Sequence, residues 1–134
     1  MFPSIKKVCL AGAIMFAVSG VSVAEETLKP FTLAYTTTGD IQQIAQDVTQ
    51  KITGAGFEVV GSYSPYDGAM ILAITNDDLK KAAASSEFGG YAAGQRVTLT
   101  QVGDEIQVSY TNPTYYGTSY RVEDAEDLKK AEAA

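Results

Sequence analysis

The hydrophobic period changes in the first third of the chain, and this change restricts the possible folds more than any other feature. From Phe31 to Tyr35 apolar side chains alternate with polar or small ones, which predicts a half-buried strand. Between Asp40 and Gly56 the spacing becomes helical, because apolar residues recur at Ile41, Ile44, Ala45, Val48 and Ile52. Asp40 is well placed to complement the positive end of this helix. The domain is therefore expected to begin with a strand and an amphipathic helix.

Two strands joined by a tight turn are predicted next, at residues 57–64 and 69–75. Between them, Pro65 presets a turn angle and Gly68 can adopt a positive φ, which favours a hairpin. Both faces of the second strand are apolar, and such a strand belongs in the interior of a sheet.

A second helix and a second hairpin follow. Residues 76–88 read as a helix with Asn76 as its N-cap, and residues 96–111 read as two strands joined at Gly103 and Asp104. The element order is β-α-β-β-α-β-β. This order predicts an α+β two-layer sandwich, in which a mostly antiparallel sheet carries its helices on one face.

The last segment, residues 122–134, has a helix-prone composition and would add a C-terminal helix. Acidic residues lead and lysines trail, as the helix dipole prefers. Its apolar stripe is thin and consists of Val122, Ala125, Leu128 and Ala131. Two interpretations remain open: a frayed tail, or a helix cut short because the natural chain continues. Residues 25–121 are expected to form the single α+β domain.

The first 24 residues have the pattern of a secretory signal peptide. Lys6 and Lys7 precede an apolar run from Val8 to Val21, and small residues around Ala24 suit cleavage there. A transmembrane anchor is the alternative, but the run is shorter than the roughly 20 residues that span a bilayer. We therefore expect a periplasmic protein that keeps no stable membrane anchor after cleavage.

Charge and composition exclude several function classes. Cleavage would remove the only cysteine and two lysines, leaving 110 residues with 8 basic and 16 acidic side chains. A net charge of −8 is unsuited to binding nucleic acid. The absence of histidine and cysteine from the mature chain argues against zinc, haem, thiolate and Ser-His-Asp chemistry. We expect no cofactor and no metal, and an enzyme is less favoured than a binding or accessory module.

Tyrosines are the strongest candidates for a binding surface. Tyr110 continues the apolar face of its strand and is expected in the core. Asn112 and Pro113 form a turn pair, after which an extended backbone would point Tyr115 and Tyr116 to opposite sides. The candidate ligand-binding residues are Tyr66, Tyr91, Tyr115, Tyr116, Tyr120 and Arg96, provided that their loops converge. The alternative is that these rings only cover the end of the sheet.

Two other functions stay open beside a non-catalytic module that binds a small molecule or a protein. An enzyme using carboxylate or tyrosine chemistry on a small molecule would need groups such as Asp67, Asp77 and Arg96 close together in a pocket. A protein–protein interaction module would pair through an open sheet edge, with a homodimer as one form.

Residues 33–120 also resemble a known family. The strand that begins at Gly56 and Phe57, the hairpin after it, and the exit at Val108, Tyr110, Asn112 and Pro113 are similar to exported bacterial members of the domain-of-unknown-function family numbered three hundred and two. The resemblance implies a small α+β domain of similar element order. It implies no agreed activity and no catalytic residues.

Overall fold

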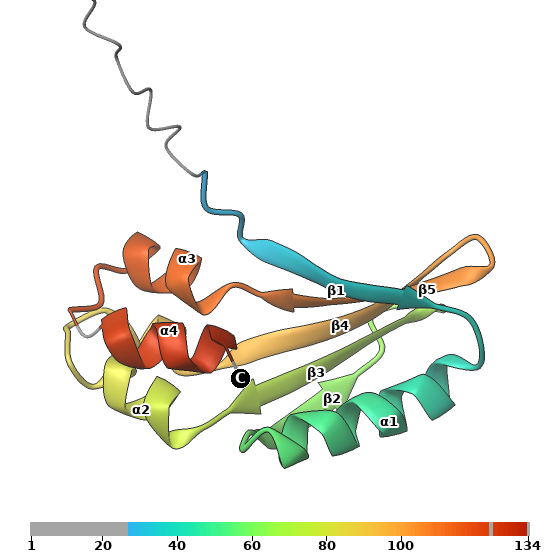
Figure 1. Cartoon of the computed structure of the whole chain (residues 1–134), viewed down its shortest axis with the longest axis horizontal. Coiled ribbons are helices and arrows are strands. Elements are labelled where there is room, and N and C mark those ends of the chain that lie inside the picture. Colours follow the sequence, from blue (N-terminus) through green and yellow to red (C-terminus); the bar gives the residue numbers. More distant parts are fainter. Residues whose placement is uncertain (1–26, 124, 134) are drawn as a thin grey trace, which may run out of the picture.

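The computed structural model describes residues 27–123 and 125–133, so the predicted signal peptide and its cleavage site lie outside the described residues. The elements in chain order are β1 (Phe31–Thr37), α1 (Ile41–Gly54), β2 (Glu58–Tyr63), β3 (Ala69–Thr75), α2 (Asp77–Ala83), the 3₁₀ helix η1 (Gly89–Ala92), β4 (Gln95–Val102), β5 (Glu105–Thr111), α3 (Pro113–Ser119) and α4 (Ala125–Ala133). Figure 1 shows a twisted sheet with α1 beneath one half and α2, α3 and α4 around the other end. The fold is of the predicted α+β class.

The sheet has five strands in the order β1-β5-β4-β3-β2, and every neighbouring pair is antiparallel. Strand β3 is interior, as its two apolar faces predict. Both predicted hairpins form, and their turns contain glycines with positive φ, Gly68 at 81° and Gly103 at 62°. Strands β1 and β2 occupy opposite edges, so α1 carries the chain from one edge of the sheet to the other.

Helix α1 buries its apolar stripe against one face of the sheet. Ile44, Ala45 and Val48 pack with the buried side chains of β3, β4 and β5, which are Leu72, Ile74, Val97, Leu99, Ile106 and Val108. The half-buried ring of Tyr110 packs against this cluster, in agreement with its predicted place in the core. The carboxylate of Asp40 accepts hydrogen bonds from the first-turn amides of Gln42 and Gln43, both at 3.0 Å. The buried stripe accounts for the helical period in the sequence, and the Asp40 cap accounts for the residue at which the helix begins.

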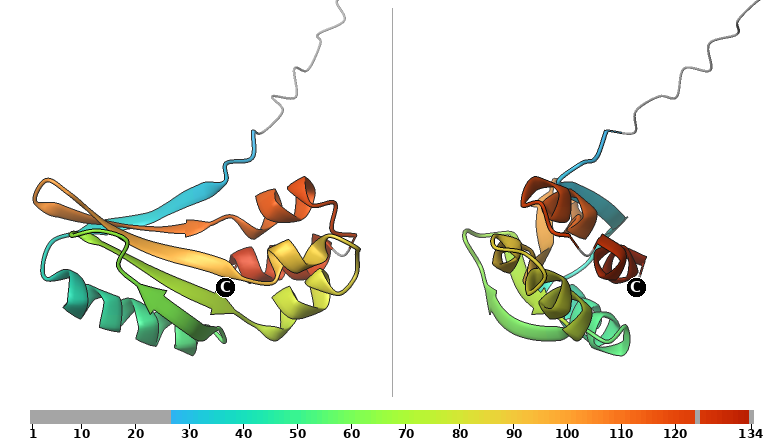
Figure 2. Two further views of the ribbon diagram at one scale, coloured as in Figure 1. Left: turned by 180° about the vertical axis from the view of Figure 1, so that it is seen from behind. Right: turned by 90° about the vertical axis from the view of Figure 1, so that its left-hand side faces the viewer.

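The other helices, α2, η1, α3 and α4, pack together at one end of the sheet (Figure 2). Their core consists of Leu79, Ala82, Ala92, Val122, Leu128 and Ala131. Residues 125–133 form a docked helix instead of the frayed tail that was one of the two interpretations, because α4 packs on α2 and α3 and leaves Leu128 only 1% exposed. Helix α2 begins at its predicted cap, Asn76, but ends at Ala83.

Strand β1 contains an irregularity that the sequence pattern did not reveal. Leu33 pairs with Ser109, whereas Tyr35 pairs with Val108, so Ala34 is an extra residue in a β-bulge. The predicted single apolar face of Phe31, Leu33 and Tyr35 is therefore wrong. Tyr35 lies on the α1 face, while Phe31 and Leu33 lie on the opposite face and are 46% and 54% exposed.

The segment after β5 is helical rather than extended, which corrects the expectation for Tyr115 and Tyr116. Asn112 is an N-cap whose Oδ1 accepts a hydrogen bond from the Tyr115 amide at 3.1 Å, and Pro113 begins α3. Proline suits the first helical position because its missing N–H would be unpaired there. A cap followed by proline was thus a helix start, where we expected only a turn.

Candidate functional site

Five of the six predicted binding residues gather at the helical end of the sheet. Tyr91 comes from η1, Tyr115 and Tyr116 from α3, Tyr120 from the residue that caps α3, and Arg96 from β4. We call this group, with the neighbouring ring of Phe31, the tyrosine surface. Segments that are separate in sequence meet here because β4 starts, and β5 ends, beside η1 and α3.

The rings of the tyrosine surface form a continuous series. Tyr91 stacks on Tyr120 with 4.8 Å between ring centroids and 23° between planes, and Tyr120 is 6.3 Å from Tyr116. Tyr115 meets Tyr116 edge to face at 5.7 Å. Aromatic pairs in these arrangements each contribute about 0.5–1.5 kcal/mol beyond the area they bury. Tyr91 nevertheless remains 66% exposed, so much of its surface is available to a partner.

Arg96 brings a positive charge to these rings. Its Nη2 donates a hydrogen bond to the Tyr116 hydroxyl at 3.2 Å, and its guanidinium carbon lies 6.0 Å from the centre of the Phe31 ring. This second contact is at the limit of a cation–π interaction. The β1 bulge places Phe31 on the face of the sheet that holds Arg96. The guanidinium is thereby positioned by two aromatic side chains from different elements.

Local sequence explains how Tyr91 is displayed. Gly89, two residues earlier, is buried, and a Cβ there would collide with the backbone carbonyl of Ala83 at the end of α2. Only glycine permits this close approach at the start of η1, the 3₁₀ helix that carries Tyr91. Part of the connection between α2 and β4 is thus a short ordered helix.

Tyr66 does not join the tyrosine surface. It lies in the turn between β2 and β3, which is at the opposite end of the strands. It is 63% exposed, almost as much as Tyr91. Tyr66 is therefore a single exposed ring, and such rings are common on protein surfaces.

The proposed trio of Asp67, Asp77 and Arg96 is also not assembled. Asp67 precedes β3 and Asp77 follows it, so the seven residues of that strand, a length of roughly 23 Å, separate them. Asp77 lies in the first turn of α2, where its charge favours the helix dipole and where Lys80 is 3.5 Å away. An enzyme built on these three groups is excluded by this separation.

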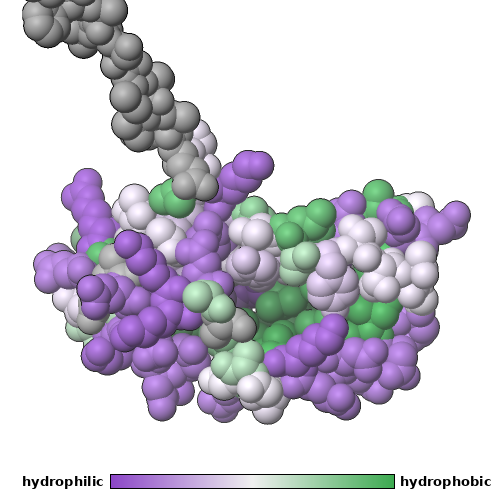
Figure 3. Space-filling model, viewed as in Figure 1, coloured by the Kyte–Doolittle hydropathy of each residue, from purple (hydrophilic) through white to green (hydrophobic). Residues whose placement is uncertain are grey.

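A groove that the sequence did not indicate lies on the α1 face. It has a volume of about 280 Å³ and is visible in Figure 3 as an apolar hollow between α1 and α4. Its floor is formed by Val48, Ile74, Val97, Val108 and Tyr110, and its margins include Tyr35, Lys51, Ala55, Phe57, Gln95, Pro113, Ala131 and Glu132. No sequence period could reveal it, because its walls come from elements that only the tertiary fold brings together.

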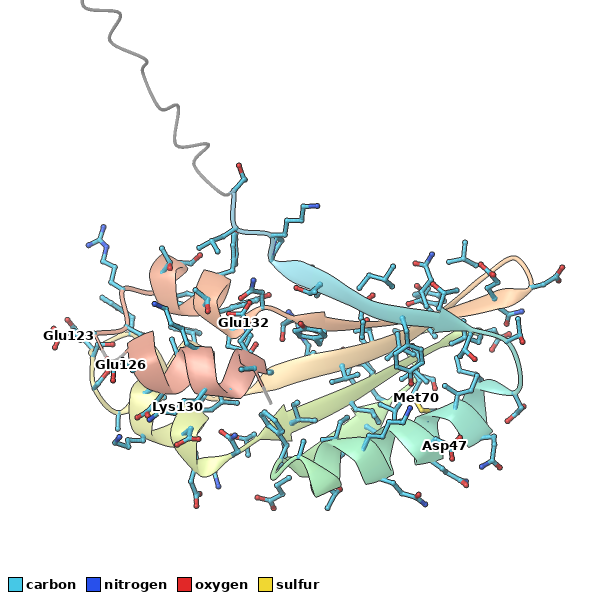
Figure 4. All side chains as sticks on the ribbon, in the orientation of Figure 1. Asp47, Met70, Glu123, Glu126, Lys130 and Glu132 are labelled. Atoms are coloured by element: carbon cyan, nitrogen blue, oxygen red, sulfur yellow. The ribbon has the colours of Figure 1, made fainter. Side chains whose placement is uncertain are left out.

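The margins of the groove carry two opposite charges. On the α1 side the Lys51 ammonium lies 4.9 Å from the centre of the Tyr35 ring. Toward α3, Glu132 accepts a hydrogen bond from the Thr114 hydroxyl, and Figure 4 shows it on the side of α4 that faces α3. Gln95 is buried nearby and accepts a hydrogen bond from the Thr111 hydroxyl at 2.6 Å. An apolar floor with a few polar groups at its margin is the usual composition of a small-molecule site.

Asp127 is the most buried carboxylate of the described residues, but it serves the packing of α4. Its two oxygens each lie 2.6 Å from an ammonium, that of Lys130 on α4 and that of Lys81 on α2. Hydrogen bonds from these two lysines lower the pKa of Asp127 from 3.8 to about 2. Within residues 27–123 and 125–133, no three acidic side chains are placed to hold a metal, and no helix is long and apolar enough to cross a membrane.

Comparison with known proteins places this geometry among solved folds. No protein-family model matches the chain, and no curated protein matches it. A solved structure does: the uncharacterized conserved protein DUF302 from Bacillus stearothermophilus, at a TM-score of 0.64. The fold is that of the DUF302 protein. The match covers 74% of this chain and 89% of the other at 14% identity, so the resemblance noted in the sequence is confirmed at the level of the fold.

Proposed function

We propose that this protein is an exported, non-catalytic binding module that contacts a protein partner through the tyrosine surface. The observation that carries the proposal is the stack of Tyr91 on Tyr120, with Tyr91 66% exposed and Arg96 held beside Tyr116. Tyrosine and arginine are enriched at the centres of protein interfaces, where they supply large contact areas and directed hydrogen bonds. The fold by itself does not indicate an activity, because the solved structure that shares it is described as uncharacterized.

The shape of the surface favours a protein over a small molecule. Small-molecule sites are concave and surround most of their ligand. The tyrosine surface lines neither the groove nor the two shallower hollows near Glu58 and Met70. An exposed ring stack supported by a fixed guanidinium suits a broad contact, in which a partner covers Tyr91 and hydrogen bonds with Arg96.

Pairing through a sheet edge is less well supported. Both edge strands contain bulges, between Leu33 and Tyr35 in β1 and between Val59 and Gly61 in β2. Bulges twist an edge and interrupt the regular row of hydrogen-bonding groups that a second strand would need. The tyrosine surface is therefore the better candidate for a homodimer as well as for a different partner.

Site-specific photo-crosslinking tests the proposal. A photoreactive phenylalanine analogue is placed at Tyr91 or, as a matched control, at the equally exposed Tyr66 of the full chain in its native host. We expect a defined crosslinked species from position 91 and none from position 66. A mass of twice the chain would identify a second copy as the partner, and mass spectrometry would identify any other protein.

Affinity then establishes whether the contact is specific. With the identified partner purified, Tyr91→Ala and Arg96→Ala should each weaken binding about tenfold or more, while Tyr66→Ala should leave it unchanged. Equal crosslinking from both positions would contradict the proposal. So would an affinity that is insensitive to both substitutions in the tyrosine surface.

A further inference from the structure

The groove on the α1 face is separate from the tyrosine surface. Arg96 and Val97 are consecutive in β4, and consecutive side chains of a strand point to opposite faces of the sheet. Arg96 contacts the tyrosine surface, whereas Val97 forms part of the groove floor. A ligand in the groove would therefore be independent of a partner bound to the tyrosines.

We propose that the groove binds a small molecule with an apolar body and a terminal carboxylate. A volume of about 280 Å³ is just below the range of roughly 300–1,000 Å³ that is usual for ligand pockets, so the groove suits a small ligand. The floor offers only side chains such as Val97, Val108 and Tyr110, so the body that it accepts is apolar. This size corresponds to a medium-chain fatty acid or a small aromatic acid.

The carboxylate is assigned by the charge at the open margin. Lys51 lines the groove, and its ammonium contacts the Tyr35 ring, but among the described residues it forms no salt bridge. A ring face attracts a cation without neutralising it, so the ammonium is available to an anion. Glu132, toward α3, already accepts a hydrogen bond from Thr114. Its negative charge disfavours a carboxylate at that end and so orients the ligand with its acid group toward Lys51.

Octanoate is a suitable probe, because it is a small molecule with an apolar body and a terminal carboxylate, and octylammonium and 1-octanol are its charge-reversed and neutral counterparts. The affinity of each probe is measured by adding it to residues 25–134, below its micelle concentration, and following the amide chemical shifts of the protein. We expect octanoate to bind with a dissociation constant of about 0.1–10 mM, and about two- to fivefold more tightly than either counterpart. Shifts should concentrate on residues such as Val97, Val108 and Ala131.

Three variants sharpen the test. Lys51→Glu should reverse the preference, so that octylammonium binds more tightly than octanoate, while Lys129→Glu on the exposed side of α4 should not. Ala55→Leu places a larger side chain at the groove margin and should weaken all three probes. Dispersed amide spectra and an unchanged melting temperature show that each variant is folded.

The proposal is overturned if octylammonium binds the natural chain at least as tightly as octanoate, or if no saturable shift occurs by 10 mM, the upper end of the expected range. Shifts confined to the tyrosine surface would overturn it as well. Failure here leaves the partner contact at Tyr91 unaffected, and loss of that contact leaves octanoate binding unchanged, so the two proposals are tested separately.

Discussion

The carboxylate of Asp127 on α4 lies 2.6 Å from the ammonium of Lys81 on α2, a residue 46 positions earlier in the chain. The Asp127 side chain is only 2% exposed, whereas both of its lysine partners remain largely in solvent. A buried carboxylate needs such partners, because losing hydration without them would be strongly unfavourable. This ion pair therefore fixes how α4 docks on the rest of the domain.

Acid should weaken this docking in a defined pH range. The pKa of Asp127 is lowered from 3.8 to about 2, so its carboxylate stabilises the fold above pH 3.8, and this contribution is lost as the pH falls toward 2. Asp127→Asn should lower the melting temperature at pH 7 and flatten its dependence between pH 5 and 2. Asp47→Asn, on the exposed side of α1, is the matched control and should retain the natural pH profile. Identical profiles for the natural chain and Asp127→Asn would contradict this assignment.

Gly117 and Leu128 should behave as a coupled pair. A Cβ at position 117 would overlap the Leu128 side chain, which is 1% exposed. We expect Leu128→Ala to cost about 2–5 kcal/mol and Gly117→Ala to destabilise despite the better helix propensity of alanine. In the Leu128→Ala background the overlap is gone, so Gly117→Ala should become neutral or stabilising. Denaturant unfolding of the four chains measures the coupling, and additive effects would refute it.

Asn112 should control the helix that carries two of the tyrosines. Its side chain caps α3, and its backbone N–H donates a hydrogen bond to the carbonyl of Pro30 at 2.9 Å. Asn112→Ala removes only the cap and should cost about 1 kcal/mol, whereas Asn112→Asp should retain most of the stability. Near-ultraviolet circular dichroism should also change in Asn112→Ala, because Tyr115 and Tyr116 lose their fixed orientation. An unchanged spectrum would show that the rings hold α3 without its cap.

The turn between α3 and α4 should tolerate glycine better than its natural residue. Arg121 has a φ of 55°, and the Val122 amide donates a hydrogen bond to the Gly117 carbonyl at 2.9 Å. This is the geometry of a helix end that usually has glycine at the left-handed position. A left-handed conformation costs a non-glycine residue about 1–2 kcal/mol, and glycine avoids this cost. Glycine also raises the conformational entropy of the unfolded chain, which offsets part of the gain. Arg121→Gly should therefore stabilise the fold by less than about 1 kcal/mol. A lower melting temperature would indicate that the Arg121 side chain contributes more than its backbone strain costs.

Much of the fold could be predicted from local patterns. The α1 stripe of Ile44, Ala45 and Val48, the acidic helix start at Asp40 and the cap at Asn76 are short-range signals, and the structure has each of them where it was expected. That the tyrosines meet in space could not be predicted from the sequence, and it was only stated as a requirement for a binding site. It depends on where β4 begins relative to α3, which the order of the strands determines and no local period records.

The groove and the buried Asp127 could not be predicted from one sequence. The groove is lined by residues of several elements, among them Ala131 and Glu132 of α4, and the position of α4 depends on the turn at Arg121 and on packing at Gly117. Asp127 belongs to the acidic start of the last segment, and no residue nearby in sequence indicates Lys81 as its partner. Long-range pairs of this kind require the tertiary structure.

The extra residue at Ala34 has a consequence for how this chain can vary. It places the two halves of β1 in different environments. Phe31 and Leu33 face solvent, and Phe31 also contacts Arg96, whereas Tyr35 lines the groove, so different side chains are acceptable in each half. Polar residues should thus be tolerated at position 33 and rejected at 35, although both positions share one alternating pattern. An alignment gap at 34 would preserve both surfaces, because removing the extra residue leaves Leu33 and Tyr35 paired with the same neighbours on β5.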